Sequence, residues 1–240
     1  MSWPTISLAG RVIAVTGAGR GIGRATVDEL LRREARVVAG ARDPGRLPAA
    51  EGLVALPLVV DDAASCEAFA AAALARCGRI DGLVNNAGIL ADEATPALAV
   101  EDAVLRESLE VNLLGPYRLC RLVLPGMLAR GFGRIVNVSS GWGSIAGMGA
   151  GMGAGMGGGV PLAYGLSKLA LNGMTRRLAA AVSGDVKVNA LCPGWVRTDM
   201  GGAGAPRRPE QPAREIADLL AVGADGPNGG FYREGRPAAW

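Results

Sequence analysis

Histidine is absent from this chain of 240 residues, and aromatic residues make up only 4% of it. A histidine general base is therefore excluded, and a zinc site is not expected, because protein zinc sites are built largely from histidine and cysteine. The cysteines are Cys66, Cys77, Cys120 and Cys192, and their spacing is not that of a paired metal-binding motif. We expect these cysteines to be buried core thiols and the protein to bind no metal.

An excess of charge is also lacking, because 25 Lys and Arg against 22 Asp and Glu leave a formal net charge of +3. The basic residues form no run, so neither a nucleic acid nor a membrane surface is an expected partner. The N-terminus has no basic region followed by a long apolar stretch, which makes a secretory signal unexpected and the cytoplasm the expected location. Small molecules are the expected partners.

Half of the residues are hydrophobic, which is enough for the core of one α/β domain over residues 1–240. Short β-rich apolar runs alternate with helical patterns. The expected strands are 11–16, 36–40, 53–60, 82–85, 134–139 and 186–191, and the expected helices are 21–32, 63–76, 101–130, 163–182 and 212–222. This alternation predicts a Rossmann-type, doubly wound parallel sheet with helices on both faces and a site at the carboxyl ends of its strands.

Tyr164 and Lys168 lie four residues apart in an expected helix, with Ser140 upstream. That spacing places a phenol and an ammonium group on one helix face. A neighbouring cation favours the phenolate and so lowers a tyrosine pKa from its usual value of about 10. The pair indicates proton-transfer chemistry, whereas the same spacing alone is also typical of a solvated helix surface.

A glycine-rich turn over residues 16–23 joins the apolar run 12–15 to the next expected helix. Gly17, Gly21 and Gly23 allow backbone amides to approach a pyrophosphate, and the helix N-terminus adds partial positive charge. The spacing Gly-x-x-x-Gly-x-Gly predicts a dinucleotide-binding turn. The alternative is a bare glycine turn between a strand and a helix.

Five motifs stand in a fixed order along the chain. They are 16–23, Asn85-Asn86-Ala87-Gly88, Val111-Asn112-Leu113, Ser140 with Tyr164 and Lys168, and Pro193-Gly194-Trp195-Val196-Arg197-Thr198. On these motifs the chain resembles the short-chain dehydrogenase/reductase family from about Leu8 to Trp240. Its ending, from Gly229-Gly230-Phe231-Tyr232-Arg233 to Trp240, is most similar to the carbonyl-reductase branch.

The resemblance implies a catalytic role for four residues. Tyr164 would protonate a carbonyl oxygen as hydride arrives, or act as the base in the reverse direction. Lys168 would lower the pKa of Tyr164 and hold the nicotinamide ribose, and Ser140, with Ser139 as its neighbouring competitor, would orient the substrate oxygen. Asn112 would link Lys168 to solvent through a water, or else mark a capped or kinked helix position.

The end of the second expected strand predicts the cofactor. An NAD enzyme carries an acidic residue there to bind the ribose 2′-hydroxyl, but this chain has Ala41. Arg42, next to it, and Arg20, in the glycine turn, could both bind a 2′-phosphate, so NADP is the expected cofactor. Asp43 could instead face a ribose or open a turn.

Further contacts follow from the resemblance. Val59 stands where the family usually has an aspartate that meets the adenine, so that contact is either absent or made by Asp61. The expected cofactor-binding residues are Gly17, Arg20, Gly21, Ile22, Gly23, Arg42, Val60, Asn86, Ala87, Gly88, Tyr164, Lys168, Pro193, Gly194, Val196 and Thr198. The expected substrate-binding residues are Ser140, Trp142 and Trp195, although core packing of both tryptophans is an alternative.

Residues 139–167 carry no charge, and 146–159 repeat Met-Gly-Ala-Gly. The glycines and Pro161 argue against a membrane span and a stable helix. The repeat is interpreted as a loop over the substrate pocket, with Met148, Met152 and Met156 covering the substrate, or as a neutral surface expansion.

The expected function is reduction of an apolar ketone or aldehyde with NADPH. The alternatives are an alcohol dehydrogenase working in the oxidative direction and a non-catalytic NADP-sensing protein. The resemblance also implies a homo-oligomer, formed through the helix that bears Tyr164 and Lys168 and the helix before it.

Overall fold

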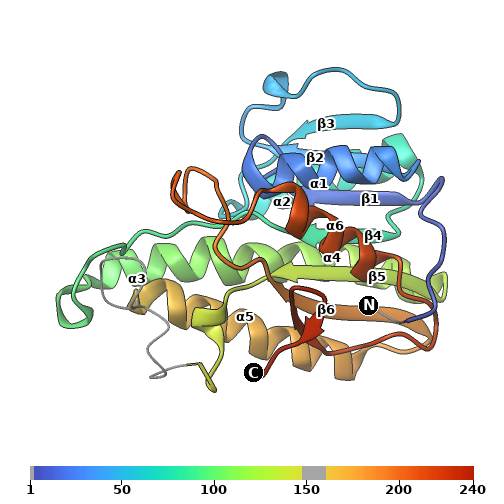
Figure 1. The fold of residues 1–240 in the computed structure, drawn as a ribbon. Helices are drawn as coiled ribbons and strands as arrows, with labels where there is room; N and C mark the ends of the chain where they lie inside the picture. The colour runs from blue at the N-terminus through green and yellow to red at the C-terminus, as the bar shows by residue number, and fades with distance from the viewer. Residues whose placement is uncertain (1–2, 148–160) are drawn as a thin grey trace.

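Buried apolar strands form the centre of the molecule. The computed structural model describes residues 3–147 and 161–240, so most of the methionine-glycine repeat, with Met148, Met152 and Met156, lies outside the described residues. Within them the chain forms an eight-stranded sheet in the order β3-β2-β1-β4-β5-β6-β7-β8 (Figure 1). The strands are β1 (Val12–Thr16), β2 (Arg36–Ala41), β3 (Leu53–Pro57), β4 (Gly82–Asn85), β5 (Phe132–Val138), β6 (Asp185–Cys192), β7 (Phe231–Arg233) and β8 (Arg236–Pro237).

Neighbouring strands run parallel except β8, which pairs antiparallel with β7. Side chains of β1 alternate between two cores, with Ile13 and Val15 in one and Val12 and Ala14 in the other. This alternation is the period of a strand that is buried on both faces. The sheet therefore needs helices on each side.

Helices cover both faces of the sheet, as expected for a doubly wound fold. They are α1 (Gly21–Arg32), α2 (Ala63–Cys77), α3 (Asp102–Leu109), α4 (Gly115–Ala129), α5 (Leu162–Ala181) and α6 (Glu210–Leu220). Buried residues of α1 and α6 share one core, and buried residues of α2, α4 and α5 share the other (Figure 1). The Rossmann-type α/β fold expected from the sequence is confirmed.

The helix expected over 101–130 is divided. A π-helical segment, η3 (Glu110–Leu114), separates α3 from α4. Two local causes coincide, because the Asn112 side chain bonds to distant parts of the chain and Pro116 has no N–H to continue the helical ladder. Asn112 lies in this π-helical segment, where the regular α-helix is interrupted.

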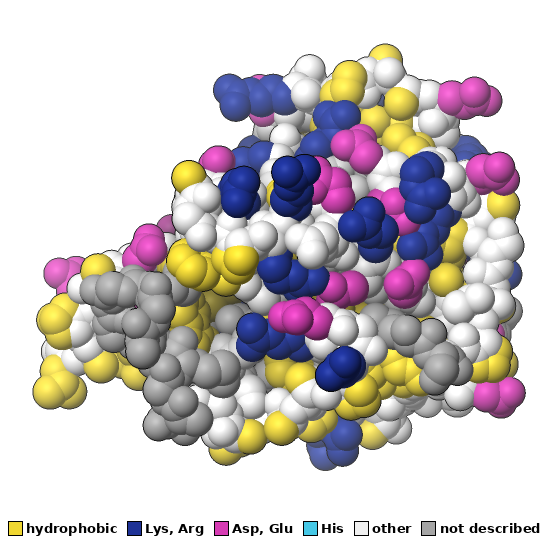
Figure 2. Space-filling model, in the orientation of Figure 1, with side chains coloured by type: hydrophobic (Ala, Val, Ile, Leu, Met, Phe, Trp, Pro, Cys, Tyr) yellow, Lys and Arg dark blue, Asp and Glu magenta, His cyan; other side chains and the backbone are white. Residues whose placement is uncertain are grey.

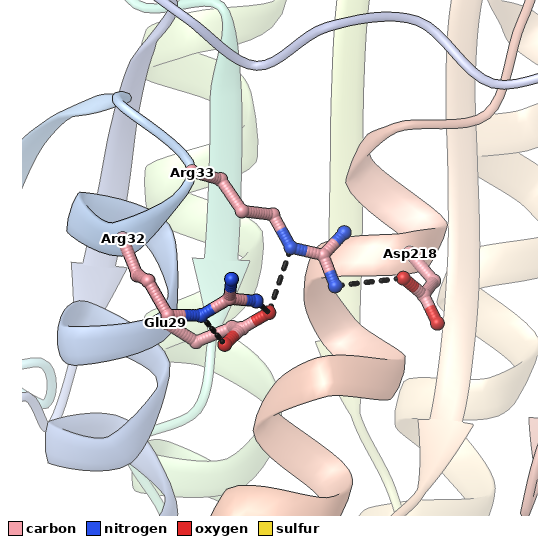
Figure 3. A network of polar contacts seen from close by, with 4 residues as sticks. All are labelled: Glu29, Arg32, Arg33 and Asp218. Atoms are coloured by element: carbon pink, nitrogen blue, oxygen red, sulfur yellow. Dashed lines mark hydrogen bonds and ion pairs between the residues drawn. The ribbon is translucent and has the colours of Figure 1, made fainter.

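Charged side chains join the end of α1 to α6, the two helices that cover one face of the sheet (Figure 3). Glu29 accepts hydrogen bonds from Arg32 and Arg33, and Arg33 also donates to Asp218 of α6 at 2.8 Å. Burial raises the pKa of Glu29, but the hydrogen bonds from the two arginines outweigh burial and leave that pKa below its usual value. These contacts link the end of α1 to α6, the helix that follows the segment after β6.

Candidate active site

The glycine turn is closed against β4. A Cβ atom on Gly23 would lie 2.2 Å from the Gly17 carbonyl oxygen, and Gly17 has a φ of +63°, so side chains are excluded at both positions. Thr16 Oγ1 accepts hydrogen bonds from the amides of Asn86 and Ala87 at 3.0 and 2.9 Å. The motif after β4 thus lies directly beside the glycine turn.

The start of α1 fits a bound phosphate. No side chain caps this helix N-terminus, and a Cβ on Gly21 would meet Thr198 at 3.1 Å, which leaves no room for a larger residue. Backbone amides at an uncapped N-terminus bind anions, and the helix dipole favours them. The residues present therefore fit the pyrophosphate of a dinucleotide.

The two arginines expected at the ribose lie near this turn and are exposed. Arg20 forms an ion pair with Asp199, in the segment after β6, whereas Arg42 is exposed just beyond the end of β2. Val59, where an aspartate is usual, is 39% exposed, and Val60 is buried. Position 41, where an NAD enzyme carries an acidic residue, is a buried alanine.

Tyr164 lies on the first turn of α5. Burial raises its pKa above the usual value, and a hydrogen bond with the Ser140 side chain opposes that rise only in part. The Lys168 Nζ lies 5.6 Å from the centre of the Tyr164 ring, and burial is the largest influence on the pKa of the phenol. A lowering of this pKa by Lys168 stays a prediction.

Lys168 is 4% exposed, and its Nζ donates a hydrogen bond to the Val138 carbonyl at 2.8 Å. Burial lowers its pKa to about 8. A Cβ on Gly88 would lie 3.0 Å from Asn112 Oδ1 and 3.4 Å from Lys168 Nζ, so these three residues are neighbours. The lysine is thus enclosed by two of the motifs that the sequence singled out.

The side-chain amide of Asn112 forms hydrogen bonds within the protein. Its Nδ2 donates to the Ile89 carbonyl and to Ser167 Oγ, and its Oδ1 accepts from the Ile89 amide. Asn112 thereby joins η3, the segment after β4 and α5. The water-mediated relay from Lys168 stays a prediction.

The adjacent serines have different surroundings. Ser139 is 1% exposed, and its hydroxyl donates to Asn172 Oδ1 of α5 at 2.6 Å. Ser140 is less buried, and its hydroxyl accepts a hydrogen bond from the Trp142 amide. Asn172 also donates to the Gly143 carbonyl at 2.9 Å, so it holds the turn on which Ser140 and Trp142 stand.

Asp92 is a site residue that sequence reasoning missed. It is 1% exposed, lies in the loop after β4, and accepts hydrogen bonds from the amides of Ala163 and Tyr164 at 2.6 and 3.3 Å. A carboxylate satisfies orphan amides at a helix start and complements the helix dipole. Asp92 therefore fixes where α5 begins, and with it the position of Tyr164.

A cavity opens at the carboxyl ends of the strands, the edge beside which Figure 2 shows hydrophobic side chains gathered. Ser140, Trp142 and Tyr164 line one side of it, and the Trp142 ring stands edge-on to Tyr164 at 5.8 Å. The residues expected at the cofactor that also line this cavity are Ile22, Pro193, Gly194, Val196 and Thr198. Trp195 lines it and is 36% exposed.

The structure thus brings most of the expected catalytic and substrate residues to one place. Asn112 and Lys168 lie behind Tyr164 rather than on the cavity wall, and Arg42 and Val60 lie away from it. Cys192 and Arg233 also line the cavity, although the sequence did not mark them. Cys192 directly precedes Pro193, which could have identified it.

Comparisons with known proteins agree with this geometry. The family described as short chain dehydrogenase matches residues 11–208. A 3-oxoacyl-[acyl-carrier-protein] reductase of Vibrio harveyi is 36% identical over 81% of this chain and 77% of its own length. The bovine protein carbonyl reductase [NADPH] 1 is 33% identical over 95% of this chain and 98% of its own length.

Among solved structures, an NADPH-bound carbonyl reductase from chicken fatty liver superposes with a TM-score of 0.83 at 29% identity, covering 97% of this chain and 100% of that one. This chain belongs to the short-chain dehydrogenase/reductase family. Members of the family are oxidoreductases that use a nicotinamide cofactor.

Two negative findings apply to residues 3–147 and 161–240. No helix there is long and apolar enough to span a membrane. No cluster of three or more histidine, cysteine, aspartate or glutamate residues in those ranges could bind a metal ion.

Replacing Asp92 by alanine should destabilise the protein by about 2 kcal/mol, because two buried amides lose their acceptor. Hydrogen exchange at Ala163 and Tyr164 should become faster, and urea unfolding should give the free-energy loss. Glu93→Ala, at an exposed neighbouring position, is the matched control. Unchanged exchange at Ala163 in the Asp92 variant would show that the carboxylate does not hold the helix start.

Replacing Lys168 by methionine should stabilise the protein at pH 7 by on the order of 2 kcal/mol, because burying the ammonium is unfavourable. The folded wild type releases the lysine proton near pH 8, whereas the unfolded chain keeps it until about pH 10.4. Wild-type stability therefore rises over that interval, and the advantage of the variant should shrink from pH 8 to pH 10.

Urea unfolding at a series of pH values measures this difference, and Lys187→Met provides the control. Tyr164 is present in both proteins, so its own titration largely cancels. A constant difference from pH 7 to pH 10 would contradict the lowered pKa of Lys168.

Proposed function

We propose that this protein reduces an apolar ketone or aldehyde to an alcohol with NADPH. The observation that carries the proposal is the placement of the Tyr164 phenol and the Ser140 hydroxyl together at the wall of a largely apolar cavity. A tyrosine pKa is about 10 even without burial, so the phenol carries its proton at neutral pH and Tyr164 can act as an acid. The nicotinamide, when bound, supplies the hydride for the carbonyl carbon.

The residues at and behind the cavity wall have separate roles in the proposed reaction. Tyr164 gives its hydroxyl proton to the carbonyl oxygen, and the Ser140 hydroxyl donates a hydrogen bond to the same oxygen as negative charge develops there. Lys168 holds the nicotinamide ribose and supports Tyr164 from behind, and Asn112 fixes the helix that carries both. Trp142 and Trp195 provide apolar surface for the substrate.

The same proposal assigns the cofactor side to the glycine turn, to residues 86–88 and to the segment after β6. Arg20 and Arg42 would bind the 2′-phosphate of NADP, which requires Arg20 to exchange Asp199 for the phosphate. Val60 would lie along the adenosine, with no aspartate at Val59 to meet the adenine. Position 41 is an alanine, so no carboxylate there would repel the 2′-phosphate.

Oxidation of an alcohol is the second candidate, since the same residues serve both directions. It requires Tyr164 to lose its proton first, and the raised pKa of the phenol opposes that step at neutral pH. Kinetics with a ketone and with the corresponding alcohol would discriminate the two directions. A non-catalytic sensor is less well supported, because an acid, a hydrogen-bond donor and a cavity occur together.

We further propose one domain, a cytoplasmic location and a homo-oligomer. Four free cysteines fit a reducing compartment. The apolar residues exposed on the outer sides of α4 and α5, which support self-association, are Tyr117, Leu128, Leu162 and Leu166.

Tyr164→Phe should lower kcat for ketone reduction by at least about 10²-fold, because the proton donor is removed. The affinity for NADPH should change little, since no phosphate contact is lost. Steady-state kinetics and a fluorescence titration of NADPH measure the two effects. A variant that kept most of its kcat would disprove the role of Tyr164.

Arg42→Asp should shift preference from NADPH toward NADH by about tenfold or more, because a charge-assisted contact to the 2′-phosphate becomes repulsive. The measurement is kcat/KM with each cofactor. Arg46→Asp, on the nearby surface where Arg46 pairs with Asp43, is the control and should keep the wild-type preference. Equal efficiency of the two cofactors in the unmodified protein would count against NADP.

A further inference from the structure

Arg233 stands apart from its surroundings in the cavity. The other side chains that line the cavity, among the residues that the structure describes, are uncharged. They include aromatic and apolar groups such as Trp142, Trp195 and Met200. A single charge in an otherwise neutral pocket is a strong determinant of which ligand end is placed there, because few polar groups fix the orientation of a ligand.

The sheet places Arg233 on the same side as the proposed proton donor. Arg233 on β7 is paired in register with Cys192 on β6. Phe231, two residues before it, packs in one cluster with Cys192, and alternate residues of a strand share a face. Arg233 therefore projects from the face of the sheet that α5 covers, and it reaches the cavity beside Cys192.

The guanidinium group of Arg233 has only a weak partner within the described chain. Its Nε lies 3.4 Å from Glu234 Oε1, and the two side chains are 46% and 57% exposed. An exposed pair with that geometry contributes little, and a guanidinium has five donors. Arg207, the nearby cation, is engaged with Glu215 and with the Pro193 carbonyl. Arg233 can therefore turn toward a ligand at small cost.

We propose that the substrate is an oxo acid, whose carboxylate pairs with Arg233 while its carbonyl oxygen faces Tyr164 and Ser140. This inference rests on the proposed function, the reduction of a carbonyl with NADPH, and narrows its substrate to a ketone or aldehyde whose far end is a carboxylate. A guanidinium binds a carboxylate through two parallel hydrogen bonds, which fixes direction as well as position. The apolar walls of the cavity accommodate the chain between the two polar ends.

The test compares an aryl oxo acid with its methyl ester, which has the same carbonyl and lacks the negative charge. Wild-type protein should prefer the acid by about tenfold or more in kcat/KM. Arg233→Gln should remove that preference, because it should raise KM for the acid by much more than KM for the ester. Arg236→Gln, at the first residue of β8, directly after the turn, changes an arginine that does not line the cavity, so it is the matched control and should keep the preference.

Glu234→Gln provides a change in the opposite direction, because it removes the competing carboxylate and should lower KM for the acid. Equal use of acid and ester by the wild type, or an acid preference that survives Arg233→Gln, would overturn the inference. So would an Arg233-dependent preference for a ketone phosphonate with no preference for the acid.

The ester separates failure of this inference from failure of the proposed function, because the hydride and proton steps need no carboxylate. If the ester is reduced and no Arg233-dependent preference for the acid is found, the inference fails and the proposed function stands; if neither compound is reduced, the proposed function fails. Binding is measured separately, through quenching of tryptophan fluorescence by the oxo acid in the wild type and in Arg233→Gln. Equal affinity in those two proteins would also overturn the inference, whether or not turnover is observed.

Discussion

The position of one helix start determines the geometry of the whole site. Asp92 accepts hydrogen bonds from the amides of Ala163 and Tyr164, so a carboxylate from the loop after β4 sets where α5 begins. Each later contact of α5 follows from that point: Ser167 meets Asn112, Lys168 reaches the Val138 carbonyl, and Asn172 holds Ser139 and Gly143. A buried carboxylate without these donors would be strongly unfavourable, so the helix start and the loop stabilise each other.

Burial has opposite effects on the two titratable groups of the site. It raises the pKa of Tyr164 and lowers that of Lys168, and in both cases it favours the neutral form. The spacing of the two residues in the sequence indicated only their attraction. Since desolvation depends on everything packed around the pair, the direction of the tyrosine shift could not be predicted from the spacing of two residues.

Local signals were sufficient for much of the fold. The glycine turn and the apolar runs placed α1 at 21–32 and β4 at 82–85, the bounds that the structure has. The break at η3 has one local signal, Pro116, but the hydrogen bonds of Asn112 join residues 23 and 55 positions away and could not be predicted from its neighbours in the sequence. Periodicity reports one face of one helix and carries no information on such partners.

Asp92 could not be identified from the sequence for the same reason, since its partners lie 71 and 72 residues further along the chain. Arg233 escaped because β7 has only three residues, too few for a strand pattern to be recognised. The motifs therefore predicted the cofactor side and the proton donor that we propose, whereas the group that positions α5 and the group that we propose to select the substrate emerge from the tertiary structure.

The chain on either side of residues 148–160 is anchored independently. On the earlier side, Ser144 and Ala146 donate hydrogen bonds to the carbonyls of Ala239 and Trp240. On the later side, Asp92 holds Ala163. The start of α5, and with it Tyr164, is therefore held from the loop after β4, whereas the segment that ends at residue 147 is held from the C-terminal residues.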